Sequence, residues 1–232
     1  MIPYSDGIPA RRFPIVNVAL IAANFAVFMF YELPNPDAAI KQASFYVCNV
    51  DHACHMGYPW GISWVTAMFM HGGWDHILGN MWFLAIFGKN VEDAFGKLGY
   101  LVFYFAGGFA ATSLQTAMTL LFGSASDAQV PCLGASGAIA AVLGAYFVLY
   151  PSSSILTLLG WFPIRIPAWL FLGGWFLLQF FEGNSALVAA KSGGSGVAFF
   201  AHVGGFAFGA LVTGLLVGTG RIVARRPQRM GT

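Results

Sequence analysis

Six apolar segments are the feature that most restricts what this chain can fold into. They cover residues 15–31, 73–95, 98–122, 134–150, 166–181 and 197–218. Several are shorter, or richer in glycine, than the roughly 20 apolar residues of an independent membrane-spanning helix. The whole chain is 58% hydrophobic and 9% charged, whereas a soluble domain carries about 25% charged residues. So few polar residues cannot cover a water-soluble globule, and we predict an integral membrane protein.

Helices are the secondary structure expected for these segments. Backbone amides in hydrocarbon must hydrogen bond within their own segment, which a helix allows, and the segments lack the alternating pattern of a membrane barrel. We therefore predict an all-α, polytopic membrane protein with six transmembrane helices in a single domain, residues 1–232. The N-terminus lacks the basic region, apolar core and cleavage site of a signal peptide, so we expect no cleaved signal.

The basic residues indicate the orientation, because short cytoplasmic loops are enriched in lysine and arginine. With residues 1–14 in the cytoplasm, nine of the eleven basic residues are cytoplasmic: Arg11, Arg12, Lys89, Lys97, Arg165, Arg221, Arg225, Arg226 and Arg229. Only Lys41 and Lys191 face outward. Residues 221–232 then form a basic cytoplasmic tail at the membrane surface. The net charge of +2 reflects this topology, and it predicts lipid rather than nucleic acid as a partner.

The long connections lie outside in this topology. Residues 34–72 form a large first external loop, whose Tyr58, Trp60 and Trp64 indicate that part of it lies in the membrane interface. Residues 123–133 and 182–196 are the other external connections. The glycines of the last one predict mobility beside the outer surface, which would suit a lid.

Three cysteines, Cys48, Cys54 and Cys132, fall on the external side, where disulfides persist. Cys48 and Cys54 are close enough in one loop to pair. His52 and His55 beside them form a cluster that could instead hold zinc, although its spacing matches no usual structural zinc site. A disulfide, unpaired loop residues and a metal site all remain open here; we predict no metal and no cofactor.

Strongly polar residues inside apolar segments are costly, so each one is a functional hypothesis. His76 and Asn80 lie in the second segment, Ser136 in the fourth and His202 in the sixth. All three segments begin on the outer face, and a helix rises ~1.5 Å per residue, so the four side chains share one depth just below that surface. His76 and Asn80 are four residues apart and lie on the same helix face.

Glycines beside these residues predict that the serine and the histidine meet. Gly134 and Gly137 flank Ser136 and leave room for another backbone or a substrate. Gly205 and Gly209 follow His202 at the small-xxx-small spacing that lets helices pack closely. Close packing of the fourth and sixth helices would bring the two side chains together.

Such a pair has a defined chemistry. A serine hydroxyl is a weak nucleophile until a base takes its proton, and neutral imidazole is the usual base near pH 7. Attack on an amide creates an oxyanion, which the side chains of His76 and Asn80 and the N–H of Ser136 at its helix start could stabilise. We expect no acidic residue at the same depth, which favours a Ser136–His202 dyad over a triad.

Four motifs carry a resemblance to a known family. They are residues 71–80 (HGGWDHILGN), 88–96 (GKNVEDAFG), 134–137 (GASG) and 201–205 (AHVGG). In this order the chain resembles the rhomboid intramembrane serine proteases of bacterial type, with a six-helix core. The resemblance implies that Ser136 is the nucleophile and His202 the general base. It also implies that His76, Asn80 and the Ser136 amide form the oxyanion site.

The resemblance further implies the substrate and the location. Single-pass transmembrane proteins would be cleaved near the outer end of their helix, often after a small residue, with entry past the fifth helix and the 182–196 loop. The protein would be a multi-pass protein of the cell membrane, bacterial inner or plasma membrane, with both termini cytoplasmic and the active site open outward.

Two positions depart from the family pattern. Ala140 stands where some bacterial relatives have a tyrosine that packs on the histidine. Either another aromatic residue contacts His202, or its imidazole is held more loosely. Glu92 is present, but Ala94 replaces an arginine often found there, so Glu92 is expected to structure its loop with a different partner.

Other functions are possible for the same residues. A membrane serine often bonds its own backbone, and a single membrane histidine or asparagine often joins two helices; His71 is expected to bond the loop at the mouth of the second segment. A catalytically silent rhomboid-like protein that binds or chaperones membrane clients is the alternative function. Such members usually lose the serine or the histidine, and this chain has both, Ser136 and His202. A transporter or proton channel needs a water path, which the uncharged inner halves of the segments do not provide.

Overall fold

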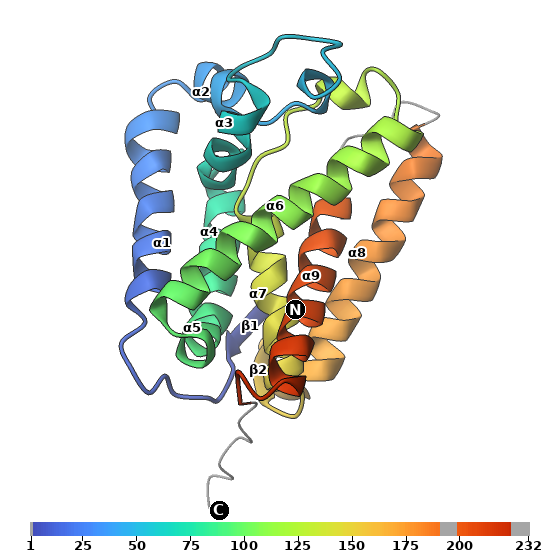
Figure 1. Cartoon of the computed structure of the whole chain (residues 1–232). Coiled ribbons are helices and arrows are strands. Elements are labelled where there is room, and N and C mark those ends of the chain that lie inside the picture. Colours follow the sequence, from blue (N-terminus) through green and yellow to red (C-terminus); the bar gives the residue numbers. More distant parts are fainter. Residues whose placement is uncertain (1, 191–198, 224–232) are drawn as a thin grey trace, which may run out of the picture.

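The computed structural model describes residues 2–190 and 199–223, and helices account for most of them. The helices that match the six apolar segments are α1 (Ile15–Val27) with η1 (Phe28–Glu32), α4 (Trp74–Phe83) with η4 (Leu84–Gly88) and α5 (Lys89–Phe95), α6 (Lys97–Phe122), α7 (Ser136–Leu149), α8 (Ala168–Ala190) and α9 (Phe199–Gly218). The all-α prediction is therefore confirmed. Figure 1 shows α6 crossing diagonally over α7 and α9, with α1 at one side and α8 at the other.

Helix length and composition bear on membrane crossing. Within the described residues, Ile15–Glu32, α6 and α9 are long and apolar enough to cross a membrane. Ser136–Leu149 and Ala168–Leu178 are shorter apolar helices. Several apolar helices are thus present, while the number six for the membrane-crossing helices stays a prediction.

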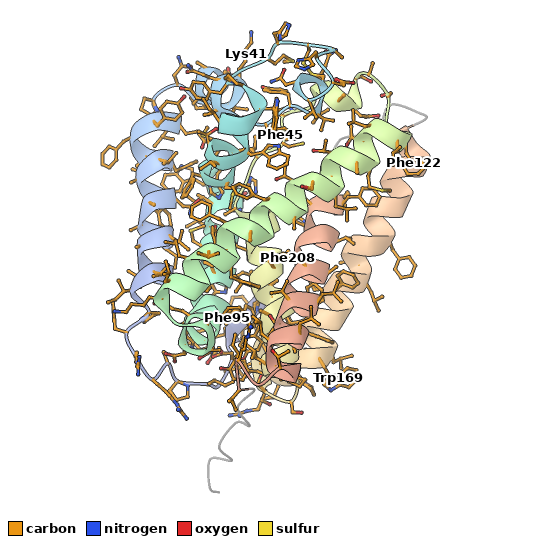
Figure 2. The ribbon with its side chains drawn as sticks, viewed as in Figure 1. Lys41, Phe45, Phe95, Phe122, Trp169 and Phe208 are labelled. Carbon is orange, nitrogen blue, oxygen red and sulfur yellow. A yellow bond between two sulfur atoms is a disulfide. The ribbon has the colours of Figure 1, made fainter. Side chains whose placement is uncertain are left out.

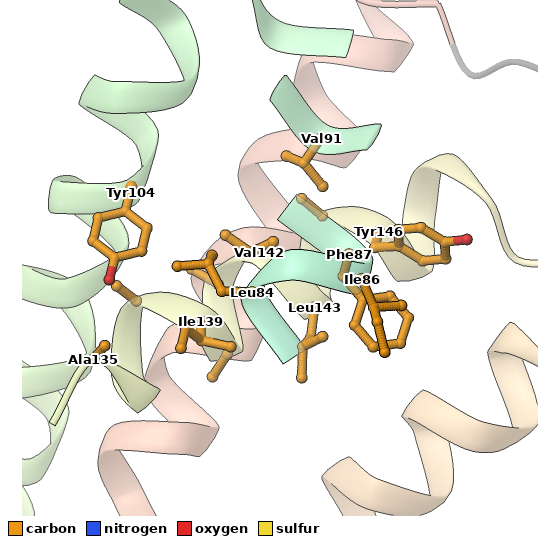
Figure 3. Close-up of a cluster of buried hydrophobic side chains, with 14 of the residues drawn as sticks. Leu84, Ile86, Phe87, Val91, Tyr104, Ala135, Ile139, Val142, Leu143 and Tyr146 are labelled. Atoms are coloured by element: carbon orange, nitrogen blue, oxygen red, sulfur yellow. The ribbon is translucent and has the colours of Figure 1, made fainter. Parts of the chain in front are cut away.

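Helix α7 forms the centre of the core. Ile139, Val142, Leu143 and Tyr146 of α7 are buried against η4, as Figure 3 shows. Glycines set the distance between α7 and α9, because a Cβ on Gly205 would overlap the carbonyl of Gly137. The predicted close packing of these two helices is present, because glycine has no side chain to hold the backbones apart.

The first external loop has a small core of its own. It contains α2 (Pro36–Ala43), η2 (Val47–Asn49), α3 (Trp60–Thr66) and η3 (Ala67–Phe69). Phe45 is fully buried, with its ring 6.1 Å from that of Trp64. Cys48 and Cys54 form a disulfide with their Cα atoms 5.3 Å apart, so the first of the three alternatives for this loop is correct. Figure 1 shows the loop at the end of the molecule opposite α5 and β2 (Ser154–Leu159).

A small sheet lies at the other end and was not predicted. Strands β1 (Ile2–Ser5), β2 (Ser154–Leu159) and β3 (Phe162–Pro167) pair antiparallel in the order β1-β2-β3. The fifth predicted segment also differs, because α8 begins at Ala168 and continues to Ala190. Residues 182–190 of the predicted lid loop are therefore helical, and residues 191–198 lie outside the described part of the chain.

Polar contacts join the N-terminal segment to α5 at this end of the molecule. The buried Asp6 accepts a hydrogen bond from Asn90 and forms an ion pair with Lys89, with 3.0 Å between Oδ1 and Nζ. Glu92 accepts hydrogen bonds from the backbone N–H groups of Val16 and Asn17, at 3.2 and 2.8 Å. Glu92 thus caps α1, whose own first turn has no acidic residue. This is the partner that the sequence left open.

Candidate active site

Ser136 is the first residue of α7, and the loop before it requires glycine. Gly134 has φ +118°, and a Cβ there would lie 2.8 Å from Nε2 of His76. The N–H of Gly134 donates to the carbonyl of Ala67 at 2.8 Å, which fixes the loop against the first external loop. At a helix start the first N–H groups lack partners within the helix, so the N–H of Ser136 can serve as a donor.

His202 lies near the start of α9 and meets the serine. Its Nε2 is 2.8 Å from Oγ of Ser136, although the two residues are 66 positions apart in the chain. Gln115 of α6 holds the first turn of α9, since its Oε1 accepts a hydrogen bond from the N–H of Ala201 at 3.2 Å. The expected juxtaposition of serine and histidine is therefore present in the fold.

His76 is held in one tautomer by the chain beside it. The N–H of Gly72 donates to Nδ1 of His76 at 3.2 Å, so Nδ1 carries the lone pair. The proton of a neutral ring is then on Nε2, the atom that faces Gly134 in the loop before Ser136. His76 thus presents an N–H donor beside the serine.

His71 supports His76 from the external loop. Its Nδ1–H donates to the carbonyl of Phe69 at 3.3 Å, and its backbone N–H donates to Oε2 of Glu32 at 2.8 Å. The two histidine rings meet edge to face, with centroids 5.1 Å apart. Burial, and secondly the charge of His76, lowers the pKa of His71 to about 4. His71 is therefore neutral near pH 7 and has the loop-bonding role expected of it.

Asn80 lies one helical turn after His76 and has an unused donor. Its Nδ2 is buried and makes no hydrogen bond with any described residue. Buried polar atoms without a partner are rare in folded proteins. A donor of this kind is suited to a group that arrives with a ligand.

These side chains line one open cavity of about 260 Å³. Its wall comprises Asp75, His76, Gly79, Asn80, Phe83, Ser136, Ile139, Ala140, Leu143, Trp175 and His202. All four residues predicted for the site are therefore brought together. Asp75 is in the wall as well, contrary to the expectation that no acidic residue lies at this depth; it follows Trp74 in the first turn of α4, and its side chain is exposed.

Trp175 of α8 contacts the imidazole where Ala140 cannot. Its ring centroid is 5.8 Å from that of His202, with 40° between the planes. Of the two alternatives given for position 140, contact of another aromatic residue with His202 is thus the correct one. The sequence has seven tryptophans, and nothing in their pattern distinguishes this one. Gln115 could have been found, since it is a strongly polar residue inside an apolar segment.

The fold and the cavity define a class: a polytopic helical membrane protein with a serine and a histidine paired at the wall of an open cavity. A family model of the rhomboid domain matches residues 59–219, which is more than half of the chain. The chain therefore belongs to the rhomboid family.

Similar proteins include three organellar ones. Rhomboid-like protein 11, chloroplastic, of Arabidopsis thaliana is 32% identical over 129 residues, 56% of this chain and 41% of that protein. RHOMBOID-like protein 12, mitochondrial, of the same plant is 28% identical over 201 residues, 80% of this chain and 57% of that protein. Rhomboid protein 1, mitochondrial, of Saccharomyces cerevisiae is 28% identical over 193 residues, 83% of this chain and 51% of that protein.

The chain thus spans about half the length of these relatives. Their names place them in chloroplasts and mitochondria, so they give no support to a bacterial inner membrane. A membrane protein with several apolar helices is what the findings support, and the particular membrane and orientation stay predictions.

Proposed function

We propose that this protein is an intramembrane serine endopeptidase that cleaves transmembrane helices near their outer end. The observation that carries the proposal is the distance of 2.8 Å between Oγ of Ser136 and Nε2 of His202 at the cavity wall. Membership of a family that includes serine proteases adds support.

The proposed reaction follows from these two groups. Oγ of Ser136 attacks the scissile carbonyl while Nε2 of His202 takes its proton. The imidazolium then gives the proton to the leaving amine, and an acyl-enzyme remains on Ser136. In the second half, His202 takes a proton from water, whose oxygen attacks the acyl carbon. The bond from that carbon to Oγ of Ser136 then breaks, the imidazolium returns its proton to Oγ, and the acid product leaves.

The oxyanion would be stabilised by three donors. They are Nε2–H of His76, Nδ2 of Asn80 and the backbone N–H of Ser136. The Gly72 bond to His76 and the unpartnered Nδ2 of Asn80 support this assignment. A preorganised donor of this type contributes about 10²–10³ in kcat.

The cavity wall supports the proposed substrate class. Phe83 and Gly79 on α4 and Trp175 on α8 form two of its sides, so a substrate strand is expected to enter between α4 and α8. Single-pass membrane proteins in the lipid bilayer are the proposed partners. In the proposed orientation the cavity opens to the outer face of a cell membrane, because the basic residues lie mostly at the opposite end.

A reconstituted assay tests the proposal. Purified protein in liposomes is mixed with a labelled single-span substrate, and wild type is compared with Ser136→Ala and His202→Ala. Wild type should cleave and both variants should not, whereas Ser113→Ala, an exposed serine of α6, and His55→Ala, in the external loop, should keep full activity.

A second readout separates the alternative function. A fluorophosphonate probe should label wild type and fail to label Ser136→Ala. A catalytically silent protein that binds or chaperones membrane clients would bind the substrate without cleavage or labelling. Cleavage that persists in both Ser136→Ala and His202→Ala would exclude the dyad.

A further inference from the structure

Helix α8 places an aromatic ring beside the imidazole of His202, whereas the serine belongs to helix α7. Trp175 lies 5.8 Å from His202 between ring centroids and 6.3 Å from Phe206, one turn further along α9. Phe176, the next residue of α8, stacks on Phe206 at 4.6 Å. The contact between Trp175 and His202 is thus part of an aromatic cluster that joins α8 to α9.

One helical turn after Ser136, α7 has only a small side chain in the cavity wall. Ala140 is fully buried, and a Cβ on Gly205 of α9 would lie 3.2 Å from its methyl group. A methyl group there reaches toward α9 but cannot cover an imidazole ring. Trp175 and Ala140 line the same cavity as His202, and of these two only Trp175 places a ring beside the imidazole.

A neighbouring ring can restrict the orientation of the imidazole. The torsion that turns a histidine ring about its Cβ–Cγ bond has broad minima, so the groups packed against the ring contribute to its orientation. The ring of Trp175, tilted by 40° against the imidazole, limits this rotation on one side. A misplacement of about 1 Å in a reacting group costs up to about 10²-fold in rate.

We propose that Trp175 is a positioning residue of His202, holding the imidazole in the orientation that bonds Ser136, and that α8 is thereby part of the catalytic geometry. This inference rests on the proposed function. Helix α8 packs chiefly against α9 (Figure 1), so this contact links the packing of α8 to the orientation of the imidazole.

The test compares Trp175→Leu with Trp175→Phe and with a matched control. Trp169→Leu makes the same change on the same helix, at an exposed residue near the opposite end of the molecule from Lys41 (Figure 2). Trp175→Leu should lower kcat and the rate of fluorophosphonate labelling by a similar factor, about ten- to a hundredfold. Trp175→Phe should keep most of both rates, and Trp169→Leu should match wild type.

The small probe distinguishes positioning from substrate contact. It reacts with Ser136 without filling the path of a substrate helix, so a merely substrate-binding tryptophan would leave labelling unchanged. Unchanged labelling in Trp175→Leu overturns the inference. If this variant does not fold, Trp175→Met provides the same comparison with an unbranched side chain.

A rescue experiment tests the geometry directly. Adding Ala140→Tyr to Trp175→Leu supplies an aromatic ring from α7, and it should restore labelling at least fivefold. Ala140→Leu in the same background fills space without a flat ring and should not; equal recovery by both would overturn the inference. Wild type without Ser136-dependent cleavage or labelling would instead end the proposed function, independently of Trp175.

Discussion

The backbone N–H of Gly72 donates a hydrogen bond to Nδ1 of His76 at 3.2 Å. This bond leaves the proton of the neutral ring on Nε2, beside the loop that carries Ser136. Because Nε2 of His76 carries this proton, the atom can donate a hydrogen bond but cannot act as a second base. The proposed oxyanion site depends on this difference.

Replacement of His76 is therefore expected to affect turnover more than binding. His76→Ala should lower kcat about 10²–10³-fold, because one donor to the oxyanion is lost. His76→Gln retains an N–H donor and should recover part of the rate. Steady-state cleavage in liposomes measures both, and an alanine variant with wild-type kcat would contradict the assignment.

Gly134 is expected to tolerate no side chain. Its φ of +118° disfavours any L residue, and a Cβ would lie 2.8 Å from Nε2 of His76. Gly134→Ala should displace His76 or the serine loop and lower kcat about tenfold or more. Gly160→Ala is the matched control, because it also has positive φ, at +62°, but has no atom within 4 Å. It should cost about 1 kcal/mol of stability and leave cleavage unchanged.

Glu92 is expected to stabilise the fold without taking part in catalysis. Its carboxylate accepts the N–H groups of Val16 and Asn17, and the residue is 5% exposed. Glu92→Ala should lower the free energy of unfolding by about 2 kcal/mol, since the start of α1 loses its cap. Denaturant unfolding in detergent measures the change, with Asp51→Ala in the exposed loop as control. Equal stability of the two variants would refute the capping role.

His71 is expected to make stability depend on pH. Its pKa in the folded protein is about 4 because burial disfavours the charged ring, whereas the ordinary value is about 6.5. Between these values the unfolded chain binds a proton at this residue that the folded protein does not, so stability is complete above pH 6.5 and falls as pH decreases toward 4. The loss reaches about 3 kcal/mol.

Unfolding measured from pH 8 to pH 4 tests this dependence. His71→Asn has no imidazole to protonate, and its stability should fall less steeply below pH 6.5 than that of wild type. The same slope in both proteins would show that other groups cause the acid sensitivity.

The amino-acid sequence alone predicted the helical class, the six apolar segments and the four residues that line the cavity together. Apolar composition and costly polar groups act locally along the chain, so they can be read without coordinates. His76 and Asn80 share a face because of helical periodicity, and Ser136 and His202 could be matched because glycines mark close helix packing. The disulfide was one of three readings of the same local cluster.

Only the tertiary structure decided the contacts between residues that are distant in the chain. Strand β1 pairs with β2 more than a hundred and fifty residues away, and Glu92 caps a helix that begins 77 positions before it. The choice of Trp175 to cover His202 depends on which face α8 turns toward α9. Such pairings arise from the packing of whole helices. The sequence pattern does not distinguish among the many apolar and aromatic residues of these segments, so it cannot predict which of them make contact.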